Sequence, residues 1–339
     1  MIATPLEERL LQRIAEVDPR IQLLHDPELL PPPRFPMDHA GSPDFRRRPV
    51  DEQRFWEMVA SAEVMLGIPG DTPEGLSESV RRGRSLRWVQ ATAAGAGQQL
   101  LAAALSPPEL KQVVLTSSRG IHSAPLAEFA LMGILMLTHD AERLRDAQVA
   151  RRWEQFAHVD LEGKVLLVVG AGEIGRRVAT VAACLGMEVV GIRRSARATD
   201  PLAQPIAALP ELAQRADVII LCLPLTDATA RCFGPQIFAR LKPSAVLVNI
   251  GRGGVVDEVA LVEALRSRRL AGAVLDVFAT EPLPSASPLW EMPNVILSSH
   301  TAGISLHENE RLVELFVDNL RRFRSGRQMR NVVSTEEGY

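Results

Sequence analysis

The chain has 339 residues, of which 46% are hydrophobic and 23% are charged, as is typical of a globular protein of about two domains. Its net charge of −3 gives no reason to expect a nucleic acid or an anionic membrane as a partner. No apolar run approaches the roughly 20 residues that a bilayer span needs. The three cysteines form no CxxC pair, so we expect no metal site, no disulfide framework and a cytoplasmic location.

Short apolar runs alternate with helix-like segments in two series, which predicts two α/β domains built on parallel sheets. The first series has expected strands at 21–26, 62–67, 86–92 and 111–117, and expected helices that begin near Pro5, Val50, Pro73 and Gly97. The second series has expected strands at 164–169, 187–192, 217–223, 245–250, 271–277 and 294–299. Its runs are β-branched or rich in leucine with little polar alternation, as expected for strands covered on both faces.

Two further segments have helical patterns. Residues 127–144 are apolar nearly all round in their first half, which predicts a helix that bridges domains or forms a subunit interface. Residues 307–326 have the pattern of a long amphipathic helix, and its basic end suits the negative end of the helix dipole.

A glycine-rich turn follows the first strand of the second series. Its sequence is Gly170-Ala171-Gly172-Glu173-Ile174-Gly175, and a helix-like stretch comes directly after it. In a dinucleotide-binding fold the first glycine allows a tight turn, the second lets a pyrophosphate approach the backbone, and the third lets helix and strand pack closely. The order of strand, G-x-G-x-x-G and helix therefore predicts dinucleotide binding, with a purely structural turn as the alternative.

The end of the second strand in this series indicates which dinucleotide is bound. Sites that prefer NAD place an Asp or Glu there, which accepts from the ribose 2′-OH. This chain has Arg193, Arg194 and Ser195 instead, with no carboxylate. Because guanidinium groups suit a 2′-phosphate, we expect NADP(H) to be favoured; NAD(H) is the alternative, since the two arginines could simply be solvated.

Three motifs with charged side chains fall at the ends of successive later strands, the edge where open α/β sheets bind ligands. Arg252 stands between glycines, where a guanidinium can hold a carboxylate and polarise a carbonyl. Asp276 lies at the end of the next expected strand, Glu281 stands five residues later, and His300 follows the last strand. Taken singly, Arg252 could pair with an acid of the protein itself, and a histidine at a strand end is more often structural.

Taken together, these motifs resemble the D-isomer-specific 2-hydroxyacid dehydrogenase family, in particular its NADPH-dependent glyoxylate/hydroxypyruvate reductase-like branch. The resemblance also includes LRWVQATAAGAG (86–97), SSRGIHSAPLAEFAL (117–131) and LCLPLTDATARCF (221–233). Residues 1–50 match the family only loosely. Gly97-Gln98 departs from the family's pattern, which leaves the contacts of the substrate loop open.

The resemblance implies a role for each matching residue. Arg252 would bind the substrate carboxylate and carbonyl, and Glu281 would pair with His300, the general acid/base. Asp276 would lie near the nicotinamide carboxamide or near the histidine. The other cofactor-binding residues that it implies are Leu223, Pro224, Thr226, Ile250 and Gly251. The substrate-binding residues that it implies, besides Arg252, are Gly67, Ala94, Gly95 and Ala96.

The resemblance also implies an architecture of two Rossmann-like domains. Residues 1–123 and 306–339 would form a flavodoxin-like substrate-binding domain. Residues 124–305 would form an inserted, doubly wound dinucleotide-binding domain. Members of the family usually form dimers through the cofactor domain, so we expect a homodimer to which the apolar helix at 127–137 contributes.

The expected function is the transfer of a hydride between NADP(H) and a small 2-oxo acid or D-2-hydroxyacid, as in reduction of glyoxylate or hydroxypyruvate. One alternative is a phosphoglycerate or other D-2-hydroxyacid dehydrogenase that uses NAD. An alternative of another class is a corepressor-like scaffold that senses the dinucleotide. Neither a nucleic acid nor a membrane is expected as a partner.

Overall fold

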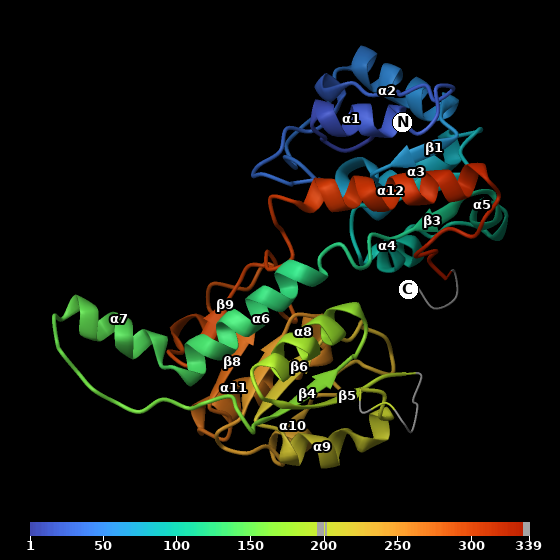
Figure 1. Cartoon of the computed structure of the whole chain (residues 1–339). Coiled ribbons are helices and arrows are strands. Elements are labelled where there is room, and N and C mark those ends of the chain that lie inside the picture. The colour runs from blue at the N-terminus through green and yellow to red at the C-terminus, as the bar shows by residue number, and fades with distance from the viewer. Residues whose placement is uncertain (195–199, 201, 335–339) are drawn as a thin grey trace. The chain divides into compact units, whose positions relative to one another are not determined.

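The computed structural model describes residues 1–194, 200 and 202–334, and the chain forms two compact units (Figure 1). Unit 1 comprises Met1–His122 and Ile304–Tyr339, and unit 2 comprises Ser123–Gly303. The chain therefore leaves unit 1 after His122 and returns to it after Gly303. In the described part of the chain, no helix is both long and apolar enough to span a membrane.

Unit 2 is built on a six-stranded parallel sheet, at nearly the positions predicted from the apolar runs. Its strands are β4 (Val165–Val169), β5 (Glu188–Ile192), β6 (Val218–Leu221), β7 (Val246–Asn249), β8 (Gly272–Leu275) and β9 (Val295–Leu297). Their spatial order is β5-β4-β6-β7-β8-β9. Because β4 pairs with both β5 and β6, the strand order reverses there, and ligands bind doubly wound sheets at the carboxyl ends beside such a switch point.

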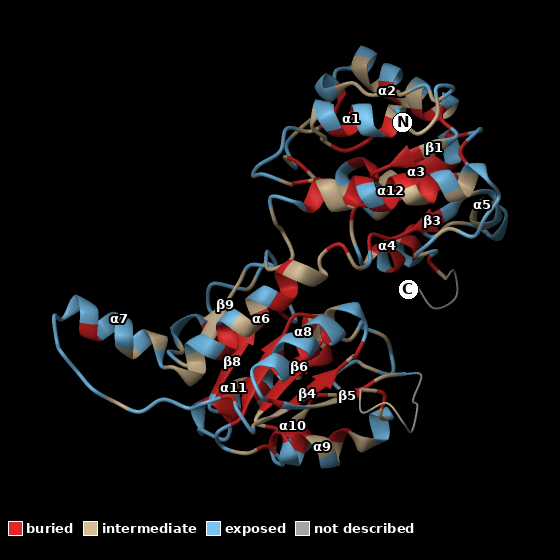
Figure 2. Cartoon of the chain, in the orientation of Figure 1, coloured by how far each residue is buried: buried red, intermediate tan, exposed pale blue. Residues whose placement is uncertain are grey.

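Helices cover both faces of this sheet. They are α6 (Ser123–Thr138), α8 (Glu173–Cys184), α9 (Leu209–Arg215), α10 (Pro235–Phe238) and α11 (Glu258–Arg266), whereas α7 (Ala141–Val149) extends away from the sheet (Figure 1). Successive residues of a strand point to opposite faces. Leu166 and Val168 therefore pack with α6 and α8, whereas Leu167 and Val169 pack with α9 to α11. These four side chains are fully buried, as Figure 2 shows for the strands of this sheet, which explains the continuous apolar runs.

Unit 1 contains a smaller parallel sheet with the order β1-β2-β3. Its elements are β1 (Val64–Leu66), β2 (Trp88–Gln90), β3 (Val114–Thr116), α1 (Glu8–Ala15), α2 (Pro49–Ser61), α3 (Pro73–Arg82), α4 (Ala96–Ala102), α5 (Pro107–Gln112) and α12 (Glu308–Arg324). Leu66 and Trp88 pack with α1 and α12, whereas Met65 and Val89 pack with α2 to α4. The two parallel sheets with helices on both faces confirm the predicted α/β class.

The strand predicted at 21–26 does not form. Leu24 O accepts a hydrogen bond from Ile2 N–H at 2.9 Å, but the segment adds no ladder to the sheet. A 3-10 helix, Pro27–Leu29, follows at once, and the side chain of Asp26 caps it. The chain therefore turns away before a second strand pairing can be made.

Two other boundaries differ from the predictions. The helical pattern at 127–144 is divided between α6 and α7, because Asp140 adopts a left-handed conformation (φ 51°) and caps α7. The strand predicted at 111–117 begins only at Val114. The residues before Val114 belong to α5, which starts with a proline and a capping box formed by Ser106 and Glu109.

Candidate active site

The turn between β4 and α8 has the backbone geometry that the glycine fingerprint predicts. Gly170 has φ +102°, which residues with a side chain rarely adopt. The N–H groups of Gly170 and Ala171 donate to Ile192 O at 3.0 and 2.9 Å, which fixes the turn against β5. A Cβ atom on Gly175 would lie 2.6 Å from Val168 Cγ1, so the third glycine lets α8 pack closely on β4.

Gly172 lies at the open side of this turn. A Cβ atom built there would meet no other atom within 4 Å. Gly172 is the N-cap residue of α8 and supplies no side chain to the first turn of the helix, which contains Glu173 and Ile174. The backbone N–H groups of a helix start attract phosphate, and the absence of a side chain leaves room for it. The residues present therefore fit the pyrophosphate of a dinucleotide.

Two of the three residues predicted to contact the 2′-OH or 2′-phosphate of the adenosine ribose follow β5 directly. Arg193 N–H donates to Gln204 O at 3.0 Å, which holds the start of the loop. The Arg193 side chain is half-buried and that of Arg194 is exposed. Ser195 lies outside the described residues.

An acid near these arginines was missed by the sequence reasoning. Arg176 lies near the start of α8, and its Nη2 donates to Asp200 Oδ2 at 3.0 Å. Hydrogen bonds from the Leu202 backbone and from Arg176 lower the pKa of Asp200, and the charge of Arg193 contributes to the shift. The carboxylate is therefore ionised among the arginines and offsets part of their charge.

The loops after β6 and β7 contain the other residues that the resemblance assigned to the cofactor, and they approach each other closely. These residues are Leu223, Pro224, Thr226, Ile250 and Gly251. A Cβ atom on Gly251 would lie 2.8 Å from Leu223 O, so only a glycine allows this approach. Thr226 N–H donates to Thr229 Oγ1 at 2.8 Å, which closes the turn after β6.

Arg252 comes directly after this approach and is held through its backbone. Asn249 Nδ2 donates to Arg252 O and Asn249 Oδ1 accepts from Gly251 N–H, each at 3.2 Å. Burial lowers the pKa of Arg252 from its ordinary value, while the charges of Glu281 and Asp276 act to raise it. The guanidinium still stays charged. Because it is partly removed from water, its field on a bound anion is stronger than that of an exposed arginine.

His300 and Glu281 form a direct pair. His300 Nδ1 lies 2.7 Å from Glu281 Oε2, and Glu281 Oε1 accepts from Phe278 N–H at 3.0 Å. The side chain of His300 is 48% exposed. Because Nδ1 faces Glu281, Nε2 is the ring nitrogen on the side away from the carboxylate.

Asp276 supports the segment that contains His300. It is 2% exposed at the end of β8. Its backbone carbonyl accepts from His300 N–H at 2.9 Å, and its Oδ1 accepts from Ala302 N–H at 3.0 Å. Asp276 therefore holds the backbone on both sides of the imidazole-bearing turn.

Asn249 is the second residue that the sequence reasoning missed. It is 1% exposed and holds the loop that positions Arg252 by accepting and donating one hydrogen bond each. A polar residue at the end of the otherwise apolar run AVLVNI was the signal for it, because a buried amide must find partners.

The residues assigned to the substrate lie in unit 1, apart from Arg252. Gly67 follows β1 with φ +88°, and its N–H donates to Gln90 O at 2.8 Å. Ala94 is exposed, Gly95 is the N-cap residue of α4, and Ala96 is buried. They follow β1 and β2, at the carboxyl edge of the unit 1 sheet. Among the described residues, no cluster of His, Cys, Asp and Glu is arranged to hold a metal ion.

A doubly wound sheet with a glycine cradle at its switch point, and Arg, Glu and His at its carboxyl edge, defines a nicotinamide-dinucleotide-dependent oxidoreductase. The family model described as D-isomer specific 2-hydroxyacid dehydrogenase, NAD binding domain, matches residues 131–302. The chain belongs to the D-isomer specific 2-hydroxyacid dehydrogenase family and is an NAD(P)-dependent enzyme.

Individual relatives agree with this family. The (S)-sulfolactate dehydrogenase of Chromohalobacter salexigens is 36% identical over 62% of this chain and 70% of that protein. Glyoxylate/hydroxypyruvate reductase B of Citrobacter koseri is 30% identical over 85% of this chain and 90% of that protein. A D-isomer specific 2-hydroxyacid dehydrogenase from Xanthobacter autotrophicus, solved in complex with NADPH and MES, is similar with a TM-score of 0.75. It is 27% identical and the match covers 99% of this chain and 97% of that one.

Proposed function

We propose that the protein uses NADPH to reduce a small 2-oxo acid, such as glyoxylate or hydroxypyruvate, to the corresponding 2-hydroxyacid, with the D configuration where the product is chiral. The observation that supports this most strongly is the His300–Glu281 pair, 2.7 Å apart, at the carboxyl edge of the sheet that also carries Arg252. The similarity to a glyoxylate/hydroxypyruvate reductase over most of the chain favours this substrate class.

Each charged side chain has a separate task in this proposal. NADPH, when bound, supplies the hydride to the carbonyl carbon. As negative charge grows on the carbonyl oxygen, the guanidinium of Arg252 stabilises it and also holds the substrate carboxylate. His300 Nε2 donates the proton that completes the alcohol, and Glu281 stabilises the imidazolium that must be present beforehand.

The two units divide the binding of the two ligands. Unit 2 would be the dinucleotide-binding domain, with the fingerprint at 170–175, Asp276 and the loops after β6 and β7 around the cofactor. Unit 1 would be the substrate-binding domain, in which Gly67 shapes the pocket wall. The backbone N–H groups at 94–96 would hold the substrate carboxylate.

The cofactor preference is tested at Arg193. We expect Arg193→Ala to lower kcat/KM for NADPH by about 10-fold or more and to leave kcat/KM for NADH nearly unchanged, because only NADPH has the 2′-phosphate. Arg177→Ala, which removes an exposed arginine from α8, is the matched control for the general loss of positive charge. A wild-type enzyme that prefers NADH would overturn the assignment.

The role of Glu281 is tested by the pH dependence of reduction. In Glu281→Gln the imidazolium of His300 loses the carboxylate 2.7 Å away that stabilises its positive charge. We therefore expect kcat for reduction to decline at lower pH than in the wild type, with rates closest to the wild-type rates at the acidic end. A pH–rate profile that coincides with that of the wild type would contradict this role.

A panel of 2-oxo acids with both reduced cofactors tests the function as a whole. Fast oxidation of NADPH with glyoxylate or hydroxypyruvate supports the proposal. Because the chain is similar to an (S)-sulfolactate dehydrogenase, (S)-sulfolactate should also be tested as a substrate for oxidation. Turnover of a phosphoglycerate or another D-2-hydroxyacid with NAD favours the first alternative, and tight cofactor binding without any turnover favours a dinucleotide-sensing scaffold.

The exposed apolar side chains of α6 and α7 support a homodimer. Met132, Leu135 and Met136 on α6 and Leu144 on α7 are exposed, and Trp153 just beyond α7 is 96% exposed. A surface of this kind is typical of a subunit interface.

The three free cysteines are in keeping with a reducing cytosol as the location.

A further inference from the structure

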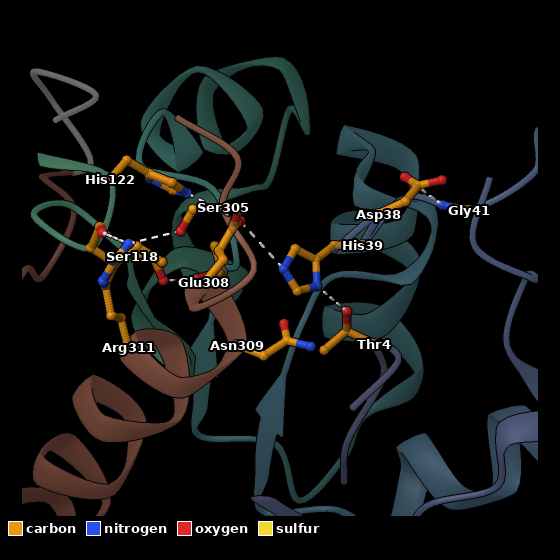
Figure 3. A network of polar contacts seen from close by, with 12 residues as sticks. Thr4, Asp38, His39, Gly41, Ser118, His122, Ser305, Glu308, Asn309 and Arg311 are labelled. Atoms are coloured by element: carbon orange, nitrogen blue, oxygen red, sulfur yellow. Dashed lines mark hydrogen bonds and ion pairs between the residues drawn. The ribbon is translucent and has the colours of Figure 1, made fainter. Parts of the chain in front are cut away.

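A buried polar cluster in unit 1 has no role in the proposed chemistry. It consists of Thr4, His39, His122, Glu308 and Asn309, and we call it the Glu308 cluster (Figure 3). His122 Nε2 lies 3.1 Å from Glu308 Oε1, and His39 Nε2 lies 3.5 Å from the same oxygen. Two imidazoles from distant parts of the chain thus face one carboxylate at the start of α12.

The charge of Glu308 depends on these two histidines. Glu308 is 5% exposed, and its Oε2 has no hydrogen-bond partner among the described residues. Burial alone would raise the pKa of Glu308, but the contacts with His122 and His39 outweigh it and lower the pKa to about 2. A buried carboxylate without a positive partner is strongly unfavourable, so the charge of Glu308 depends on the two imidazoles that face it.

The other charged groups around the cluster are already paired. Arg34 Nε donates to Asp38 Oδ2 at 2.7 Å, beside His39 in the same loop. Glu7 Oε2 accepts from Asn309 Nδ2 at 3.0 Å, which joins the start of α1 to α12. Glu310 on the first turn of α12 pairs with Arg9 of α1 and with His307, and Arg311 donates to backbone and hydroxyl oxygens. His39 and His122 are therefore the groups that can compensate the negative charge of Glu308.

His39 connects the Glu308 cluster through Thr4 to Gly67. His39 Nδ1 lies 2.7 Å from Thr4 Oγ1, and Thr4 is 1% exposed. A Cβ atom on Gly67 would lie 2.9 Å from Thr4 Cβ, so the threonine packs directly against the turn after β1. A neutral His39 with its proton on Nε2 accepts from the Thr4 hydroxyl, whereas an imidazolium donates to it. A change in the protonation of His39 thus reverses the hydrogen bond beside Gly67.

The contact between His122 and Glu308 joins the two segments of unit 1 at which the chain crosses between the units. His122 is the last residue before the first crossing, and Glu308 comes shortly after the second one. Arg311 strengthens the same connection, because its Nη1 donates to Ile121 O at 3.4 Å and to Ser305 Oγ at 3.0 Å (Figure 3). Both crossings are therefore anchored to one side-chain cluster within unit 1.

We propose that Glu308 is a positioning residue: its carboxylate, placed between His39 and His122, holds Gly67 and the segments of unit 1 next to the two chain crossings in the arrangement that binds the 2-oxo acid. The inference rests on the proposed function, because it assigns Gly67 to the substrate pocket. It makes substrate affinity depend on the protonation of the histidines. Cofactor affinity does not depend on it, since the fingerprint lies in unit 2.

The direction of the pH effect follows from the charges. Glu308 attracts an imidazole most strongly when that imidazole carries a positive charge, so the cluster is held less firmly at a pH at which the imidazoles are neutral. Histidine is the side chain that ordinarily titrates between pH 5 and 8. KM for the 2-oxo acid should therefore rise with pH in this range.

Glu308→Gln tests the proposal with steady-state kinetics of the full-length enzyme from about pH 5.5 to 8.5, within which histidines ordinarily titrate. Glutamine keeps the size of the side chain but removes its charge. We expect KM for glyoxylate or hydroxypyruvate to be on the order of 10-fold higher at the acidic end, as small misplacements of binding groups cause, and to vary little with pH. The dissociation constant for NADPH and the pH dependence that His300 gives to kcat should match the wild type.

Glu310→Gln is the matched control, because Glu310 lies on the same turn of α12 and also pairs with a histidine, His307, at 2.9 Å. This pair is exposed, and its loss should leave KM and its pH dependence unchanged. If Glu308→Gln and Glu310→Gln give the same KM profile, the proposal is wrong. His39→Gln should reproduce the effect of Glu308→Gln on KM, and a wild-type profile for this variant would also contradict the proposal.

A second measurement on the wild-type enzyme decides the proposal even if Glu308→Gln does not fold. Backbone hydrogen exchange, corrected for the intrinsic effect of pH, should show that peptides covering 31–47 and 117–123 lose protection as the pH rises, while those covering 164–192 do not. Equal protection at both ends of the range would overturn the inference. If the enzyme reduces no 2-oxo acid, the proposed function fails, and this measurement still shows whether the Glu308 cluster holds its segments.

Discussion

His300→Ala is expected to lower kcat for reduction by about 10²-fold or more, the usual loss on removal of a general acid. In the wild type the imidazole is oriented by two contacts, Nδ1 to Glu281 at 2.7 Å and the backbone N–H to Asp276 O at 2.9 Å. The variant retains the guanidinium of Arg252 and the glycine cradle, so substrate and cofactor still bind. The alcohol must then take its proton from water, and stopped-flow or steady-state oxidation of NADPH measures the difference.

The loss must be separated from an effect on folding. The side chain of His300 is 48% exposed, so truncation removes little packing, and the melting temperature should stay close to that of the wild type. His307→Ala is the matched control, since His307 is another exposed histidine that pairs with a glutamate, at 2.9 Å. A kcat for His300→Ala within about twofold of the wild type would exclude the general-acid role.

The cofactor unit was predictable because its signals are local. A strand covered on both faces must be apolar at every position, so runs such as VLLVV and VIIL mark β4 and β6 without any knowledge of their partners. The fingerprint is equally local, since Gly170, Gly172 and Gly175 all lie at the turn between β4 and α8. Arg252, Glu281 and His300 could be placed at one sheet edge because the carboxyl ends of parallel strands share it.

The remaining features depend on contacts between distant residues. Nothing within the apolar segment 21–26 indicates that only Leu24 meets Ile2 and that no ladder forms. The break between α6 and α7 depends on the left-handed conformation of Asp140, which the apolar periodicity on either side does not encode. Local patterns therefore leave open both whether an apolar segment finds a strand partner and where a helix ends.

The Glu308 cluster is the clearest case of a feature that depends on contacts between distant residues. In the sequence, Glu308 belongs to the acidic start of an amphipathic helix, where a solvated carboxylate is favoured by the helix dipole. Only the fold brings His122 beside it, 186 positions away along the chain, and places Thr4 and His39 on its other side. A buried ionisable group of this kind has no local signature, because its burial is decided by the elements that pack around it.

Gly253→Ala is expected to have the second large effect, on stability and on activity together. A Cβ atom there would lie 1.9 Å from the carbonyl carbon and oxygen of Phe278, which are backbone atoms and cannot rotate away. The two segments must therefore separate, at a cost of about 2 kcal/mol or more. For a unit of this size, the melting temperature should fall by roughly 4–8 °C.

The same separation displaces the proposed catalytic groups on both segments. Gly253 directly follows Arg252, and Phe278 N–H donates to Glu281 Oε1 at 3.0 Å, so both the guanidinium and the partner of His300 lose their positions. We expect kcat/KM for the 2-oxo acid to fall by about 10²-fold, since small misplacements of reacting groups have effects of this size. The dissociation constant for NADPH should change much less, because the fingerprint lies on β4 and α8.

The neighbouring glycine provides the control for this argument. A Cβ atom on Gly254 would lie 2.9 Å from Leu225 Cδ2, the end of a side chain that is 37% exposed and can move aside. Gly254→Ala should therefore have a melting temperature and kcat/KM near those of the wild type, although it adds the same methyl group one residue further on. Equal effects of the two substitutions would show that the loop tolerates added volume, and that the close approach of Gly253 to Phe278 does not position Arg252 and Glu281.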